Sequence, residues 1–525
     1  MTKGYLPKEL PTPFDSSSFE KIITDDYLIN TLYELNKWKK SHKDRYHESK
    51  CCNFSAPRVR NFRRQLSIPN PQYQLILCHN IDTNWKHYNQ IIDSSKISIS
   101  KPYLPICTEK SNRAFDLEMD HQNINEEIAL KSTEYNILLK TDVSRFYPSI
   151  YSHSIPWAIH TKPIAKKKRK DKNLPGNQLD YWIRGTKDGQ TLGIPVGPDT
   201  SKIIAEIIAC SVDYELQNCL TFKFAGIRII DDFILFFKNK YEAEEALSKL
   251  SEILREYELE INHKKTIITE ISYIYEPVWK TELRNYHFRE SNYIAQKTDL
   301  LSYFSRAYEY CSEYPDDNVM NYAVKIISDI KISDENIDLY NSLLLKSIFI
   351  QSSCMPYAFE LISRNKEKQF DLNKVSQSIN ELIEYHQKFG NDFEIAWSLW
   401  FAKVMKIMLA SKICDLISKN HNPIVVLIAL DLRASKLTEK DYSEDIWLDY
   451  ITSDNLYDDH WLLTYESVNK GWLVDKDNCI KKDPFYNNLH ENGVTFYNDA
   501  LKNICVINSK NMDEEGNIYN ISSSI

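Results

Sequence analysis

The sequence predicts an α+β fold over residues 1–290 followed by an all-α fold over residues 291–525. Asp231 and Asp232 stand between two short runs of aromatic and β-branched residues, which favour strands. A further apolar run ends at Asp142. Beyond residue 290 the strand signals fade, and apolar residues recur at helical spacing. We therefore expect a sheet that carries acidic residues and a separate helical domain.

The Asp231-Asp232 pair favours a tight turn, because adjacent aspartates suit a turn better than a strand interior. A β-hairpin with both carboxylates at its tip is the simplest local structure. Burying two like charges this close together costs several kcal/mol unless a cation lies between them. A surface turn whose acids face water would also explain the pair.

Asp142 supplies a third acid, at the end of a predicted strand that a neighbouring hairpin tip could reach. Three converging carboxylates suit the two divalent cations, roughly 3.5–4 Å apart, of in-line phosphoryl or nucleotidyl transfer. Hard cations with oxygen ligands indicate Mg²⁺, two per site, with Mn²⁺ as a possible substitute.

The composition is that of a soluble globular protein, with 525 residues and 42% hydrophobic residues. That length allows two to four domains, each with its own core. We find neither an apolar run of the ~20 residues needed for a membrane span nor the apolar segment of a signal peptide. The eleven cysteines lack zinc-site spacing. We expect a cytoplasmic protein without a membrane segment.

The net charge of −8 over the whole chain argues against nucleic-acid binding, but the charge is unevenly distributed along the sequence. Residues 1–300 carry a net charge of +4, and residues 301–525 carry −12. Because contact with phosphate needs local positive charge, we expect the first part to hold any nucleic-acid surface.

Two basic segments are candidates for that surface. Residues 57–70 contain four arginines in a β-like segment, and a planar guanidinium grips phosphate bidentately. Residues 162–172 form a basic run that reads equally well as a solvated loop or as a template or RNA contact, and that also looks like a nuclear-import signal. For residues 57–70, a basic strand that only faces solvent is the alternative interpretation. The candidate nucleic-acid-binding residues are Arg58, Arg60, Arg63, Lys166, Lys167, Lys168 and Arg169.

Three motifs give the chain a family resemblance. Asp142 with Phe146 and Tyr147, the turn GIPVGP at 193–198 and the Asp231-Asp232 pair occur in the order of motifs A, B and C of reverse transcriptases. The string TDVSRFYPSIYSHSIPW at 141–157 resembles more specifically the bacterial defence-associated reverse transcriptases, which include the abortive-infection group. The resemblance covers residues 50–290 and extends more loosely over the helical half.

This resemblance implies a right-hand polymerase. Residues 1–290 would form the fingers and a ferredoxin-like palm, and residues 291–525 an α-helical thumb and HEAT-like domain. It implies catalytic, metal-holding roles for Asp142, Asp231 and Asp232, with the Val143 carbonyl as a further ligand.

The resemblance implies further roles around the acids. Tyr147 would close against the 2′ position of the sugar, although it also reads as an ordinary core aromatic. Lys265, in the motif-D-like stretch 259–266, would be the general acid for pyrophosphate, although a plain surface lysine is as good a reading. The nucleotide-binding candidates are Arg64, Arg113, Tyr147, Pro195, Val196 and Gly197.

Two positions depart from the usual motifs. Val196 stands where motif B commonly has Gln, so the contact to the template base there would be apolar. Ile229 replaces the aromatic residue that generally stands two positions before the first acid of motif C. These changes put fidelity and the hold on the primer terminus in doubt, but not the metals.

The sequence thus predicts an RNA-directed DNA polymerase of a bacterial anti-phage defence system, adding dNTPs to a DNA or protein-primed 3′ end. The departure at motif C permits non-standard templating. The partners of the polymerase would be an RNA template or associated non-coding RNA, the DNA product, a companion protein and further copies of the chain. One alternative is an RNA-binding scaffold that keeps a reverse-transcriptase fold. Another is a retron or group II intron enzyme.

Overall fold

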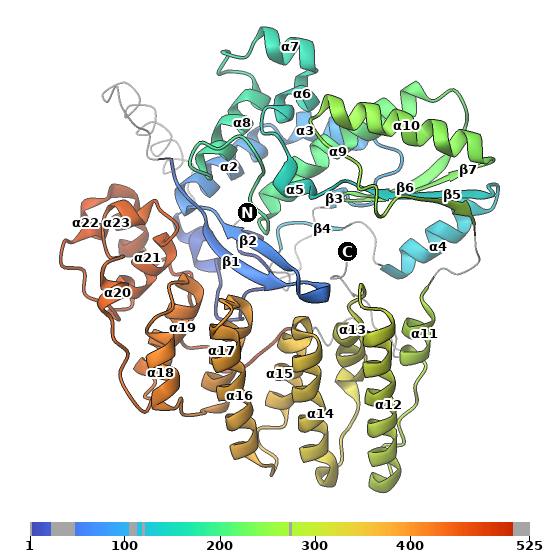
Figure 1. The fold of residues 1–525 in the computed structure, drawn as a ribbon. Coiled ribbons are helices and arrows are strands. Elements are labelled where there is room, and N and C mark those ends of the chain that lie inside the picture. The colour runs from blue at the N-terminus through green and yellow to red at the C-terminus, as the bar shows by residue number, and fades with distance from the viewer. Residues whose placement is uncertain (1–2, 23–47, 104–112, 118–120, 272–275, 508–525) are drawn as a thin grey trace.

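The computed structural model describes residues 3–22, 48–103, 113–117, 121–271 and 276–507. Its central sheet has four antiparallel strands in the spatial order β6-β7-β5-β8, namely β5 (Ile137–Asp142), β6 (Ala225–Ile229), β7 (Asp232–Phe237) and β8 (Ile267–Glu270). Helix α9 (Asp199–Cys219) precedes β6, and α10 (Lys240–Glu256) joins β7 to β8 (Figure 1). This βαββαβ order is the ferredoxin-like arrangement that the sequence predicts for the palm.

The sequence of α10 explains how the sheet is covered. Its buried residues, from Ala243 to Leu254, recur at helical spacing and leave the charged residues outside. The Asn239 side chain accepts a hydrogen bond from the Glu242 backbone N–H and caps the start of the helix. Leu139 of β5 and Phe233 and Leu235 of β7 belong to the same core as α9 and α10, so the helices pack on that face of the sheet.

The remaining elements of the first 290 residues surround this palm. The hairpin of β1 (Cys52–Pro57) and β2 (Arg63–Ile68) is followed by α2 (Pro71–Thr83), α3 (Trp85–Asp93), β3 (Pro102–Tyr103), β4 (Asp116–Leu117) and α4 (His121–Ser132). Between β5 and α9 lie α5 (Phe146–Ser149), α6 (Ser154–His160), α7 (Lys162–Lys167) and α8 (Pro175–Gly185).

The described chain from residue 276 onward contains helices and no named strand, which confirms the predicted α-helical half. These helices lie below the palm in Figure 1. They are α11 (Val278–Arg284), α12 (Tyr293–Glu313), α13 (Val319–Ile326), α14 (Ile337–Ile350), α15 (Met355–Arg364), α16 (Leu372–Gln387), α17 (Asp392–Met405), α18 (Ser411–Ile417), α19 (Pro423–Ala434), α20 (Asp445–Leu448), α21 (Trp461–Asn469), α22 (Cys479–Lys482) and α23 (Pro484–Glu491). The HEAT-like description stays a prediction.

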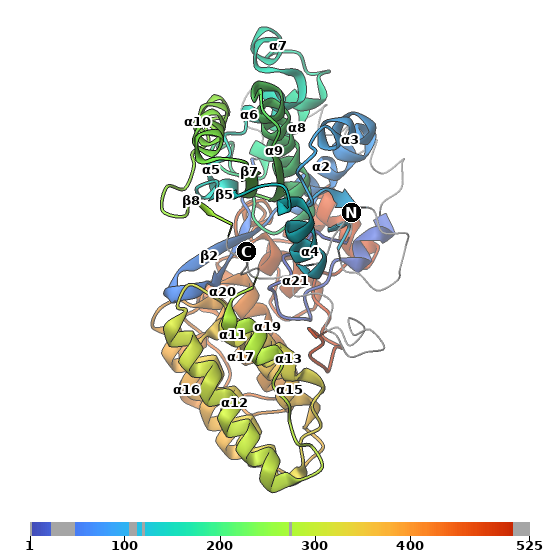
Figure 2. The same ribbon diagram turned by 90° about the vertical axis from the view of Figure 1, so that its right-hand side faces the viewer.

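The larger of the two main cores crosses residue 290. It joins Phe54 and Leu66 of the hairpin to aromatic residues of the helical half. The indole N–H of Trp397 donates to the Glu9 carbonyl (3.0 Å), and that of Trp461 donates to the Ile68 carbonyl (3.3 Å). Figures 1 and 2 both place the β1–β2 hairpin between the palm and the helices below it. The division at residue 290 stays a prediction, and the packing across it is extensive.

Two sequence features have simple structural counterparts. Within the described ranges, no helix is both long and apolar enough to cross a membrane. The cysteines of the described residues are free thiols. Burial raises the pKa of the Cys51 thiol to about 12, so this thiol stays protonated at neutral pH.

Candidate active site

The register of the palm sheet brings the three predicted acids together. Asp142, the last residue of β5, is the cross-strand partner of Asp232, the first residue of β7. Asp231 lies one residue earlier, in the two-residue turn that joins β6 to β7, and its carbonyl accepts a hydrogen bond from the Val143 backbone N–H (3.2 Å). Directly opposite residues of an antiparallel pair have Cβ atoms about 4.5–5.5 Å apart. The hairpin tip therefore meets the end of a neighbouring strand, as the sequence predicts.

Crowding raises the pKa values of the two acids in the hairpin. Burial, followed by the negative charges of Asp232 and Asp142, raises the pKa of Asp231 to about 7. Burial also raises the pKa of Asp232, and Asp142 adds to the effect, whereas Lys265 opposes it. The protein thus holds these carboxyl groups where their charged forms are disfavoured unless positive charge is supplied.

Lys265 supplies part of that charge. Its Nζ donates to Asp142 Oδ2 at 2.7 Å, although the lysine side chain is 61% exposed. Partial burial would lower the pKa of Lys265, but its hydrogen bond to Asp142 and the charges of the three acids raise it above its ordinary value. The ammonium group therefore lies at Asp142 and does not face water alone.

The donor set suits a divalent cation. Asp142 Oδ1 is buried and has no hydrogen-bond partner, so one oxygen of the site lacks a positive group. Within the described ranges, no three His, Cys, Asp or Glu side chains are already spaced to hold a metal ion. One of the three acids, Asp142, is paired with Lys265. The hard oxygen donors of Asp142, Asp231 and Asp232 are those that Mg²⁺ or Mn²⁺ prefers. The residues present therefore fit such a group.

Tyr147 lies beside this cluster. It belongs to the short helix α5, which begins after Arg145, a residue in the left-handed conformation (φ 49°). The Tyr147 carbonyl accepts from the Ile194 backbone N–H at 3.0 Å, which joins α5 to the motif-B turn. Burial raises the pKa of the Tyr147 hydroxyl, and the negative charge of Asp231 raises it further, while Arg64 opposes this. Tyr147 therefore lies within electrostatic range of Asp231.

The motif-B turn, 193–198, packs against two distant segments. Gly193 has φ 78°, and its N–H donates to the Ile150 carbonyl at 2.7 Å. Val196 is 8% exposed, and its carbonyl accepts from the Ser67 N–H of β2 (2.9 Å). Gly197 has φ 132°, and a Cβ atom there would approach Pro7 Cγ to 2.6 Å. Pro195 is likewise buried. The turn therefore packs against β2 and against the N-terminal segment.

The four arginines of residues 58–64 divide into two groups. Arg58 is exposed at the hairpin tip, and its charge lowers the pKa of Asp232, so it lies within electrostatic reach of the acids. Arg64 is half-buried near Tyr147. By contrast, Arg63 pairs bidentately with Glu394 of α17, at 2.7 and 3.0 Å, and Arg60 forms an exposed ion pair with Asp316. The guanidinium groups of Arg60 and Arg63 thus bind carboxylates of the protein itself.

Arg113, predicted to contact the triphosphate, is also engaged within the protein. Its guanidinium pairs with Asp199 at the start of α9 and donates to the carbonyls of Gly197 and Leu6, each at 3.1 Å. The same Asp199 carboxylate accepts from the Ala114 N–H at 2.9 Å. Arg113 therefore ties the motif-B turn to the N-terminal segment.

The predicted basic run is remote from the helical half. Lys166 and Lys167 end α7, and Lys168 and Arg169 follow it, all four exposed. Figure 1 places α7 at the end of the palm farthest from α12–α19.

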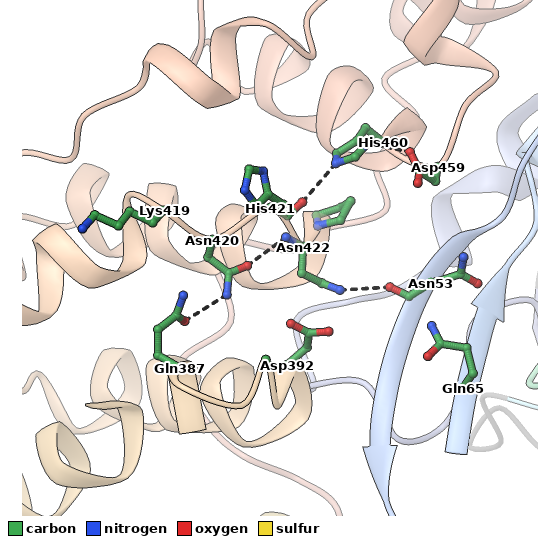
Figure 3. A pocket seen from close by; sticks show the side chains of 12 residues that line it. Asn53, Gln65, Gln387, Asp392, Lys419, Asn420, His421, Asn422, Asp459 and His460 are labelled. Carbon is green, nitrogen blue, oxygen red and sulfur yellow. Dashed lines mark hydrogen bonds and ion pairs between the residues drawn. The ribbon is translucent and has the colours of Figure 1, made fainter. Parts of the chain in front are cut away.

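A polar cavity of about 440 Å³ lies between the β1–β2 hairpin and the helical half (Figure 3). Its side chains bond largely to one another: Asn420 donates to Gln387, and Asn422 donates to the Asn53 carbonyl, each at 3.0 Å. Burial raises the pKa of Asp392 in its wall to about 6. None of the three palm acids is among its described lining residues, so the cavity is separate from the candidate active site.

Sequence reasoning missed the support beneath the hairpin. Arg228 is completely buried and pairs with two acids of α9, Glu206 and Asp213. An arginine inside a short apolar strand, three residues before Asp231, was the available signal.

Comparisons with known proteins agree with this geometry. Residues 70–288 match the family model described as "Reverse transcriptase (RNA-dependent DNA polymerase)", and this range contains all three acids. The chain thus carries a reverse transcriptase domain, and the protein is an RNA-directed DNA polymerase. Reverse transcriptases generally use divalent metals. No curated protein sequence matches the chain significantly.

Telomerases are among the solved structures that align with this chain. Apo telomerase from Candida tropicalis aligns with a TM-score of 0.33 and 13% identity, over 72% of this chain and 73% of that chain. Telomerase from Candida albicans in complex with a TWJ fragment of telomeric RNA aligns with a TM-score of 0.28 and 12% identity, over 66% and 68%.

Proposed function

We propose that the protein copies RNA into DNA by two-metal nucleotidyl transfer at Asp142, Asp231 and Asp232, and that it does so in bacterial anti-phage defence. The observation that carries the mechanism is the convergence of three carboxylates at the end of the palm strands, of which Asp142 is buried and has an unpaired oxygen. The defence role rests on the resemblance of residues 141–157.

The reaction forms one bond and breaks one. The 3′-hydroxyl oxygen of the primer, or a protein hydroxyl, attacks the α-phosphorus of a dNTP. The bond from that phosphorus to the bridging oxygen breaks, pyrophosphate leaves, and the hydroxyl proton passes to solvent. Two Mg²⁺ ions, when bound, neutralise the charge that develops on the phosphate oxygens. Asp142, Asp231 and Asp232 would hold them, together with the Val143 carbonyl.

The neighbouring side chains then take the remaining roles. Lys265 would give a proton to the leaving pyrophosphate; the contact of its ammonium group with Asp142 (2.7 Å) supports a place for it in the site. Tyr147 would exclude a 2′-hydroxyl by occupying its space. Arg58 and Arg64, which bind no described carboxylate, are the arginines left to contact phosphate.

The proposal extends to the surroundings of the enzyme. Its template would be an RNA strand or an associated non-coding RNA, and its product DNA. Because the helical half offers large surfaces, we expect a homo-oligomer in the cytoplasm, with a companion protein as a further candidate partner.

Nucleotide incorporation tests the polymerase. Purified protein is incubated with its co-purifying nucleic acid, Mg²⁺ and each labelled dNTP separately, beside the Asp231→Ala/Asp232→Ala variant. Incorporation that disappears in the variant supports the proposal, and the bases used show whether a mixed template or a repetitive product is involved. A wild-type protein that incorporates no dNTP would count against it.

The defence role needs a separate test. Cells that express the wild-type chain and the variant with Ala at 142, 231 and 232 are challenged with phage. Protection that requires the acids supports an enzymatic role in defence. Protection that persists in the triple variant would favour the RNA-binding scaffold, and protection by neither protein would remove the defence role.

A further inference from the structure

The turn that carries Asp231 contains a residue in an unfavourable conformation. Ile230, the first residue of the two-residue turn between β6 and β7, has φ 56°. A β-branched residue rarely adopts the left-handed region, because its Cβ approaches the following carbonyl oxygen. Such strain persists only when the surroundings fix it.

Both backbone polar groups of Ile230 are held by side chains. Its N–H donates to Ser100 Oγ at 2.9 Å, and its carbonyl accepts from Arg228 Nη1 at 2.7 Å. The two contacts come from different elements: Arg228 lies on β6, and Ser100 lies in the segment 97–100, which runs beside β6. The peptide groups before and after the Ile230 Cα are therefore each held by a side chain.

These two side chains are themselves anchored to α9. Arg228 Nε donates to Asp213 Oδ2 (2.8 Å), and its Nη2 donates to Glu206 Oε1 (2.8 Å), all fully or almost fully buried. Ser100 Oγ donates to Glu206 Oε2 at 3.0 Å. Burial by itself would raise the pKa of Glu206, but Arg228 lowers it below its ordinary value, which keeps this acceptor ionised. The turn is thus linked to the longest helix of the palm.

We infer that Ser100 and Arg228 are positioning residues for catalysis, because they hold Ile230 in its left-handed conformation and thereby aim Asp231 and Asp232 at Asp142. This inference rests on the proposed roles of the three acids. Neither residue touches substrate; each acts through the backbone of the turn.

Ser100→Ala is the variant that tests this, since removing Arg228 would leave two buried carboxylates unpaired and could prevent folding. We expect kcat for dNTP incorporation to fall about tenfold, with KM for the dNTP unchanged within about twofold. Ser211→Ala is the matched control: Ser211, on α9, is also buried and donates to the carbonyls of Ile207 (3.0 Å) and Ala158 (3.2 Å), but it makes no described contact with the turn, Ser100 or Arg228. Equal losses of kcat in the two variants would overturn the inference.

A double-mutant cycle shows whether Ser100 acts through Ile230. Glycine adopts a positive φ without the side-chain penalty, so a turn with Ile230→Gly needs less support. We expect Ser100→Ala to reduce kcat about threefold or less in the Ile230→Gly background. The same tenfold loss in both backgrounds would contradict a role through the turn.

Hydrogen exchange gives a readout that does not depend on activity. In protein without metal or nucleotide, the peptide spanning 224–237 should exchange faster in Ser100→Ala, where the Ile230 N–H loses its acceptor, and should be unchanged in Ser211→Ala. Unchanged exchange in Ser100→Ala would contradict the clamp. If wild-type protein incorporates no dNTP while the exchange behaves as expected, the proposed function fails but the clamp stands.

Discussion

Asp231 is the residue whose ionisation the fold changes most clearly in the site. Its pKa of about 7 exceeds the ordinary 3.8 by about three units, or roughly 4 kcal/mol of differential interaction. Because the folded state binds the proton more tightly, the free energy of unfolding should fall as pH rises from about 4 to about 7, and then level off. Asp231→Asn should weaken this pH dependence and raise the melting temperature at pH 8 in EDTA.

Thermal unfolding at pH 5 and pH 8 checks this prediction. Asp477→Asn is a suitable control, because Asp477 is exposed and forms no described ion pair. Identical pH dependence in wild type and Asp231→Asn would show that crowding of the acids does not affect stability.

Mg²⁺ should reverse the repulsion among the acids. A ligand that binds only the folded state raises the melting temperature by mass action. We expect added Mg²⁺ to stabilise wild-type protein at pH 7.5 and to have little effect on Asp142→Asn/Asp232→Asn. Differential scanning fluorimetry with Mg²⁺ and with EDTA measures both. An equal Mg²⁺ response in the variant would place the cation elsewhere.

Tyr147 should control the choice of sugar. Replacing it with alanine opens the space beside Asp231, so we expect ribonucleotide incorporation relative to deoxyribonucleotide to rise at least about tenfold, which corresponds to 1.4 kcal/mol. The measurement is kcat/KM for a matched dNTP and rNTP. Tyr214→Ala, at an exposed tyrosine on α9, should leave the ratio unchanged. A ratio that stays constant in Tyr147→Ala would make Tyr147 an ordinary packing residue.

At the scale of single residues, the sequence predicts those features of the site that follow from patterns of neighbouring residues. Two β-rich runs around an Asp-Asp pair indicate a hairpin, and an apolar run ending in Asp142 indicates its neighbour; the observed register joins them. The partners of Arg63 and Arg113 could not be predicted in this way. Glu394 and Asp199 lie 331 and 86 residues away along the chain, and nothing local marks them as partners.

Among the elements, the β1–β2 hairpin shows how two similar arginines differ. Arg63 pairs with Glu394, which is 1% exposed, whereas Arg60 (51% exposed) pairs with Asp316 (68% exposed). Removing Arg63 leaves a buried carboxylate uncompensated, so Arg63→Ala should destabilise the protein by about 3 kcal/mol. Arg60→Ala should change stability by less than about 1 kcal/mol.

Urea unfolding of the two variants measures this difference. Because Arg63 faces α17 and not the acids, kcat of the folded Arg63→Ala variant should remain close to wild type. Equal stability of the two variants would show that the hairpin does not depend on its ion pair with α17.

The element types were predictable where periodicity is strong. The amphipathic pattern of residues 241–258 corresponds to α10, and the helical spacing beyond residue 290 to α12–α23. The packing of the β1–β2 hairpin against α17 was not predictable. Phe54 and Leu66 can be recognised from the sequence as buried strand residues, but the sequence does not show which residues they contact.

At the scale of the whole molecule, the packing joins the reverse transcriptase region to the helical half. The N-terminal segment contacts both: the Asp199 N–H donates to the Gly4 carbonyl (2.7 Å), and the Asp15 N–H donates to the Phe496 carbonyl (3.1 Å). The larger core includes Tyr5 with residues on both sides of position 290. Separating the two parts would expose this apolar surface to water, at a free-energy cost of about 25 cal/mol for each Å² exposed.

We therefore expect the chain to unfold in one cooperative transition. Differential scanning calorimetry of the intact chain should show a single peak, whose calorimetric and van't Hoff enthalpies agree. The fragment 1–290 should be insoluble or much less stable, because Phe54 and Leu66 lose their partners. The fragment 291–525 should likewise lack the melting transition of the whole chain. Two separate transitions, or a fragment that melts at the temperature of the intact protein, would show that the halves fold independently and that the shared core contributes little to either.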